Sequence, residues 1–158
     1  MIAPRPSPAV ESMLTSGQLS RITADSDLAA AMLDRAQARL RSVRRALDAD
    51  DLGECAAPLW DAVRLTCTAL LQAQGLRTHG EGHHASVLEA ANEQYGHILG
   101  PGLKPGRRLK ESRRQAQYPT SVLSERLVAT EIEEDVNTVA NLIDASARLL
   151  PDIPVYRP

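Results

Sequence analysis

Apolar side chains recur at helical spacing through most of this sequence. From residue 28 to residue 47 they follow one another at alternating intervals of four and three, as Leu28, Met32, Ala36, Leu40, Val43 and Leu47. Such intervals place the residues along one face of an α-helix. Asp25-Ser26-Asp27 precede the stripe and are typical N-cap residues, so a helix with one buried face is predicted to begin there.

The next two helices are bounded by glycines. Residues 54–74 carry two apolar stripes, which is typical of a central helix with several neighbours, and Gly75 is suited to end it. A glycine-broken loop over 76–84 follows. The third helix is predicted to begin near His83 and to end across Gly96 and the Gly100-Pro101-Gly102 cluster.

Two helices are predicted in the remainder of the chain. A basic helix extends over about 105–117 and is stopped by Pro119. A connection over 120–129 leads to a capping box, in which Thr130 is the N-cap and Glu133 the third helical residue. The last helix then runs to Pro151, and its apolar stripe is Val128, Ile132, Val136, Val139, Ile143 and Leu150.

These elements predict an all-α fold. No segment alternates in the manner of a strand, and the aromatic content is 3% with no phenylalanine, which favours helices packed through aliphatic residues. With 158 residues the chain is expected to form one domain. We expect an antiparallel bundle of four to five helices over 25–150, a flexible N-terminal segment over 1–24 with room for a short helix, and an irregular tail over 151–158.

Cysteine usage indicates the compartment. Cys55 and Cys67 would lie about 18 Å apart along one helix, too far to form a disulfide. Unpaired thiols are typical of a reducing compartment. The proline-punctuated start does not resemble a signal peptide, and no stretch is apolar enough to span a bilayer. A cytoplasmic protein without membrane contact is predicted.

The histidines and glycines do not form a recognisable cofactor site. His83 and His84 are adjacent, so on a helix their side chains point about 100° apart, and neither His79 nor His97 completes a ligand spacing. Gly80 and Gly82 are not expected to follow a strand, so a phosphate-cradling loop is not indicated. No metal and no cofactor are predicted.

Basic residues gather in two places. The first helix carries Arg35, Arg39, Arg41, Arg44 and Arg45 away from its apolar stripe. This face could bind nucleic acid or an acidic partner, or it could simply be solvated, as most charged helix faces are. On the basic helix, Arg107, Lys110 and Arg114 share one face.

Arg113 falls on the other face of the basic helix, with small apolar residues, and therefore needs an acceptor. The acceptor could be a phosphate, or it could be Asp61, which lies three residues from Arg64 and could also pair with that arginine.

The chain resembles the HEPN superfamily, helical bundles named for nucleotide binding in higher eukaryotes and prokaryotes. The matching features are the second helix ending in 70–77, Gly82-His83-His84 at the start of the third helix, the run 113–119 and the long final helix. The similarity covers about residues 28–150.

The resemblance implies a homodimer that binds RNA or nucleotides, as in toxin–antitoxin and defence systems, with Asp61, Arg64, His83 and His84 in supporting roles. Many members carry an arginine, a polar residue and a following histidine, which cleave RNA without metal. Arg113 and Arg114 match the first two positions, and Tyr118 stands where the histidine would be.

This departure bears on catalysis. A ribose hydroxyl must lose a proton during cleavage, and the phenol of tyrosine, with a pKa of about 10, is a poor base near neutral pH. Arg113 and Tyr118 are thus the candidate catalytic pair of a degenerate motif, and weak or absent ribonuclease activity is expected. Arg107, Lys110, Arg113 and Arg114 are the candidate phosphate-binding residues. The alternative is an inactive helical module whose basic helix docks on an acidic partner protein.

Overall fold

The computed structural model describes residues 7–79, 83–103 and 122–157, without the side chains of 83–84, 101–102 and 122–128. Its α-helices are α1 (Pro8–Thr15), α2 (Ser26–Asp48), α3 (Ala56–Gln74), α4 (His83–Leu103) and α6 (Val122–Leu149). Strands β1 (Leu19–Arg21) and β2 (Leu76–Thr78) pair antiparallel. Short 3-10 helices cover Leu52–Glu54 and Leu150–Asp152. The predicted all-α helical bundle is confirmed.

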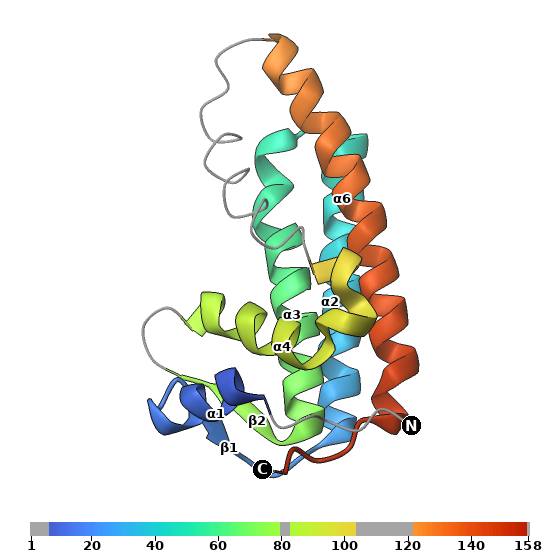
Figure 1. Ribbon diagram of the computed structural model, residues 1–158. Coiled ribbons are helices and arrows are strands. Elements are labelled where there is room, and N and C mark those ends of the chain that lie inside the picture. Colours follow the sequence, from blue (N-terminus) through green and yellow to red (C-terminus); the bar gives the residue numbers. More distant parts are fainter. Residues whose placement is uncertain (1–6, 80–82, 104–121, 158) are drawn as a thin grey trace.

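Three long helices form the body of the bundle. Helices α2, α3 and α6 lie side by side, and α2 runs antiparallel to the other two (Figure 1). Helix α4 lies across α3 and also contacts α6. Helix α1, the two strands and the C-terminal residues gather at the end of the bundle where α2 begins and α3 and α6 end.

Helix α2 begins as predicted, but its buried face is displaced by one residue at its N-terminal half. The Asp25 carboxylate accepts a hydrogen bond from the backbone N–H of Leu28 at 2.8 Å, which makes Asp25 the N-cap. Leu28 itself is 44% exposed, whereas Ala29 and Leu33 are buried. The reason is close packing: Ala29 and Leu33 share a cluster with Ala69 and Ala73 of α3, whose small side chains let the two helices approach.

Helix α3 is the central helix, as predicted. It contacts α2, α4 and α6, and thirteen of its nineteen residues are buried. Gly75 ends it in the left-handed conformation at φ 78, and a Cβ on this glycine would lie 2.8 Å from the carbonyl oxygen of Ile22. Both observations explain why glycine occupies the position.

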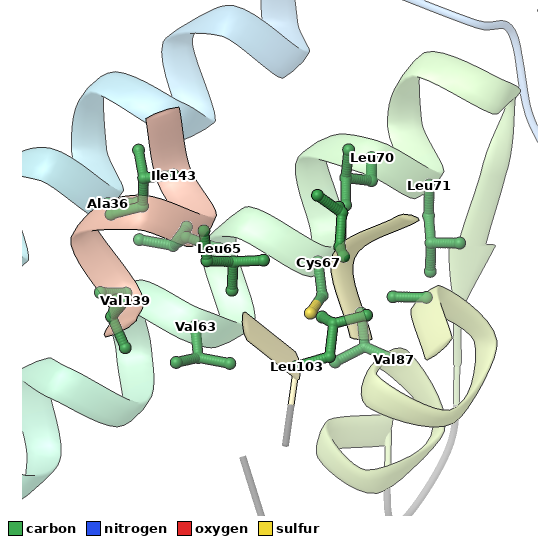
Figure 2. Packing of buried hydrophobic residues seen from close by; sticks show 14 of the residues in the cluster. Ala36, Val63, Leu65, Cys67, Leu70, Leu71, Val87, Leu103, Val139 and Ile143 are labelled. Atoms are coloured by element: carbon green, nitrogen blue, oxygen red, sulfur yellow. The ribbon is translucent and has the colours of Figure 1, made fainter. Parts of the chain in front are cut away.

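The core fills the space between these helices. Figure 2 shows Val139 and Ile143 of α6 close to Ala36 of α2, and Cys67 of α3 directed toward Val87 and Leu103 of α4. All of these residues are at most 6% exposed. Each large aliphatic side chain buried in this way contributes about 1.5–3 kcal/mol.

Helix α4 extends beyond its predicted end. It continues through Gly96 and through the Gly100-Pro101-Gly102 cluster as far as Leu103. Tyr95, Leu99 and Leu103 are spaced four apart and are all buried. Burial of this stripe outweighs the helix cost of a glycine, which is about 1 kcal/mol.

Helix α6 begins earlier than predicted. It starts at Val122, so Thr130 lies inside the helix and is not its N-cap. Residues 122–129 contain neither glycine nor proline, and nothing in them interrupts a helix. The predicted stripe is otherwise confirmed where side chains are described: Ile132, Val136, Val139, Ile143 and Leu150 are all buried.

Within the segment 1–24, for which the sequence predicted flexibility with room for a short helix, the described residues form a helix and a strand. Val10 and Met13 of α1 and Leu19 of β1 are buried in the main core. The short helix is α1 (Pro8–Thr15), and strand β1 follows it. The absence of strands was also predicted and is wrong, because strands of three residues are too short to display a period.

Candidate nucleic-acid interface

The basic run predicted from the sequence lies outside the described residues. This applies to Arg107, Lys110, Arg113, Arg114 and Tyr118. His83 and His84 form the first turn of α4 as predicted, although their side chains are also outside the description.

Asp61 is the predicted site residue whose surroundings are best defined. On α3 its carboxylate accepts hydrogen bonds from Arg64, which confirms the predicted pairing at three residues' distance. Its other oxygen accepts from Nε of Arg39 on α2 at 2.8 Å. The Asp61 side chain is 25% exposed, so each ion pair contributes about 0.2–1 kcal/mol.

The ion pair between Arg39 and Asp61 could not be predicted from the sequence, because it forms only when the two helices lie side by side. Once α2 and α3 are aligned antiparallel, Arg39 lies opposite Asp61. Each oxygen of this carboxylate therefore accepts hydrogen bonds from a described arginine, one on α2 and one on α3.

Helix α2 presents the largest group of described arginines. This group, called here the α2 arginine face, consists of Arg35, Arg39, Arg41, Arg44 and Arg45. All five are exposed. Within the described residues, Arg39 is the only one of them that forms an ion pair. The Nε of Arg45 donates to the carbonyl oxygen of Arg41 at 3.4 Å.

The arginines of this face lie on two flanks of the helix. With about 100° per residue, Arg41, Arg44 and Arg45 fall within an arc of about 100°, and Arg35 and Arg39 lie on the flank nearer α3. The flank facing α6 is marked by Gln37, whose amide donates to Asp144 at 3.4 Å.

A second polar cluster holds the two ends of the described chain together. The Tyr156 hydroxyl donates to the Glu11 carboxylate at 2.7 Å, and Nη1 of Arg21 donates to the Tyr156 carbonyl oxygen at 3.1 Å. The Arg21 guanidinium also lies 5.3 Å from the centre of the Tyr156 ring. We call Glu11, Arg21 and Tyr156 the terminal clasp.

Tyr156 is 2% exposed and belongs to the core cluster. Burial, together with the hydrogen bond to Glu11, raises the pKa of its phenol. The backbone N–H of Tyr156 donates to the carbonyl oxygen of Gln74 at 2.9 Å, which satisfies one acceptor at the end of α3. The tail was predicted to be irregular, and that prediction did not include the packing of Tyr156 in the core.

The glycines at 80 and 82 follow a strand, contrary to the sequence-based expectation. Strand β2 ends at Thr78, and α4 begins at His83. His79 precedes the glycines and contacts the hydroxyl of Ser20 on β1 through its Nε2. Residues 80–82 lie outside the described part of the chain.

Both cysteines are free thiols, in agreement with the prediction that they do not pair. Burial raises the pKa of the Cys67 thiol to about 12. Burial, assisted by the charges of Asp51 and Glu54, raises the pKa of Cys55 to about 11. Both thiols are therefore neutral at physiological pH and poor nucleophiles.

The described residues contain no group of three or more His, Cys, Asp or Glu side chains placed to hold a metal ion. No helix within 7–79, 83–103 and 122–157 is long and apolar enough to cross a membrane.

The description of the fold and of the α2 arginine face rests on the residues of this chain. No protein-family model, curated protein or solved structure matches it.

Proposed function

We propose that this protein is a HEPN-like helical bundle that binds RNA or nucleotides through phosphate. The observation that carries the proposal is the charge of residues 107–114, which include five cationic residues and one acidic residue. Within this run Arg107, Lys110, Arg113 and Arg114 are assigned to phosphate, because a guanidinium can bind a phosphate through two parallel hydrogen bonds.

The environment of Asp61 supports this assignment. The sequence left two acceptors open for Arg113, a ligand phosphate or the Asp61 carboxylate. Asp61 already accepts hydrogen bonds from Arg39 and Arg64, which favours phosphate as the acceptor for Arg113. Asp61 and Arg64 then act in support, by holding α2 and α3 together.

Cleavage is expected to be weak or absent. Arg113 can stabilise charge on a phosphate, but Tyr118 is a poor general base at neutral pH, so binding would not lead to efficient turnover. By its resemblance, the protein is proposed to act as a homodimer. Its two free cysteines support a cytoplasmic location.

The test is the binding of a labelled single-stranded RNA, measured by fluorescence anisotropy in EDTA over a series of salt concentrations. Arg113→Ala with Arg114→Ala is expected to weaken binding and to reduce the slope of log K against log salt by about 1.4, since each phosphate contact on a single strand contributes about 0.7. Arg77→Ala with Arg148→Ala removes the same charge elsewhere and is expected to leave the slope unchanged.

Cleavage is followed on gels in the same samples. RNA is expected to remain largely intact with the wild type, and any cleavage that does occur is expected to be lost in Tyr118→Phe. Absence of binding at low salt would overturn the proposal. It would favour the alternative, an inactive interaction module whose basic helix docks on an acidic protein.

A further inference from the structure

We propose that the α2 arginine face is a second phosphate-binding surface, which makes an RNA strand, rather than a mononucleotide, the ligand of this protein. The inference rests on the proposed function for its ligand class, but it concerns a different and fully described surface. Its central residues are Arg41, Arg44 and Arg45.

The arrangement of these arginines has a cost that a merely solvated face would avoid. Arg41 and Arg45 are four residues apart, and neither forms an ion pair among the described residues. Like charges at this spacing are neighbours on a helix and destabilise it by about 0.2–0.5 kcal/mol per pair, whereas a solvated face normally alternates its charges. An anion bound between the arginines would offset this repulsion, which would explain why the like charges are adjacent.

The charge balance leaves the surface positive. Between residues 34 and 48, α2 carries five arginines and the two acids Asp34 and Asp48. Asp61 compensates Arg39, so within residues 34–48 the other four arginines outnumber the two carboxylates by two. On α6, Asp144 contacts Gln37 and not an arginine. The whole chain has a formal charge of -2, so this excess is local.

The shape and composition of the surface favour a nucleic-acid backbone over a protein partner. Protein interfaces are usually built around an apolar centre. The exposed large hydrophobic residues of the described chain are Leu28, Ile98 and Val155, and none of them lies between Arg35 and Arg45. The stretch from Arg35 to Arg45 extends about 15 Å along the helix axis, with a cation at nearly every turn. A chain of phosphates matches such a row.

The test extends the salt titration to Arg41→Ala/Arg44→Ala/Arg45→Ala. With a single-stranded RNA of about twenty nucleotides, the slope of log K against log salt is expected to fall by about 2, three contacts at about 0.7 each. Binding of a mononucleotide is expected to be unchanged. The matched control is Arg77→Ala/Arg148→Ala/Arg157→Ala, which removes the same charge from other exposed positions.

Folding of the triple variant is checked by thermal unfolding. Its Tm is expected to be equal to that of the wild type or higher, because alanine is the best helix former and the like-charge neighbours are gone. A lower slope with an intact fold is therefore attributable to lost phosphate contacts.

The outcomes separate this inference from the proposed function. If the wild type binds RNA and only the Arg113/Arg114 variant loses affinity, the α2 arginine face is not a binding surface and this inference is overturned alone. If only the α2 variant loses affinity, the inference stands and the assignment of Arg113 and Arg114 fails. If the wild type does not bind RNA at low salt, both are overturned.

Discussion

The terminal clasp offers a direct test of how the tail contributes to stability. Tyr156 fills a place in the core with its ring, donates a hydrogen bond to Glu11 and lies beside the Arg21 guanidinium. Tyr156→Phe removes the hydroxyl alone and is expected to lower the free energy of unfolding by about 1 kcal/mol, because the acceptor Glu11 is 40% exposed and can be solvated again. Tyr156→Ala also removes the ring and is expected to cost about 3–5 kcal/mol.

The assay is equilibrium unfolding in urea, followed by circular dichroism. Against a total stability of about 5–15 kcal/mol, the loss in Tyr156→Ala is large and should shift the midpoint clearly. Val155→Ala is the matched control, since Val155 is the preceding residue and is 49% exposed, and its effect should remain within about 0.5 kcal/mol.

A double-mutant cycle isolates the hydrogen bond. Tyr156→Phe, Glu11→Ala and the double variant are expected to give a coupling energy of about 1 kcal/mol between the two side chains. The reasoning is refuted if Tyr156→Ala is as stable as Val155→Ala, because the tail would then not be held against the core in solution.

Three further predictions concern the helices. Gly75→Ala is expected to destabilise the protein by about 2 kcal/mol, because the backbone of Gly75 is left-handed and an added Cβ would lie 2.8 Å from the Ile22 carbonyl oxygen. At Gly100 nothing lies within 4 Å of an added Cβ, so Gly100→Ala should be neutral or stabilise the protein by up to about 1 kcal/mol in the same urea assay. Asp25→Ala removes the N-cap of α2 and should lower the free energy of unfolding by about 1 kcal/mol. If the variant is as stable as the wild type, the cap contributes nothing. The pKa of the Cys67 thiol is near 9.0 in the unfolded chain and about 12 in the fold, so the free energy of unfolding should fall as pH rises above about 9. In urea unfolding between pH 7 and pH 10.5, Cys67→Ala should show a weaker decline of this free energy than the wild type.

The ends of a helix were predictable from the sequence where they depend only on residues close by in the chain. An N-cap within Asp25-Ser26-Asp27 and a helix end at Gly75 were both foreseen, because each depends only on its own backbone neighbourhood. The ends of α4 and the start of α6 were not. Gly96 continues a helix because Tyr95 and Leu99 beside it are buried by other elements, and local propensity does not contain that information.

The candidate site divides in the same way. The pairing of Asp61 with Arg64 was predictable from their spacing along one helix, whereas the bond from Arg39 depends on the packing of two helices. The terminal clasp had no sequence signal at all, because Glu11 and Tyr156 lie at opposite ends of the chain. Polar contacts of this kind become apparent only when the tertiary arrangement is known.

The terminal clasp also has a consequence for the order of folding. Glu11 and Tyr156 are 145 residues apart in the sequence, and closing a loop of that length costs about 4 kcal/mol of chain entropy before any contact repays it. Local helices and their neighbours form more readily, so the two ends are expected to meet after the rate-limiting step. Substitutions at Tyr156 should therefore accelerate unfolding while leaving the folding rate almost unchanged.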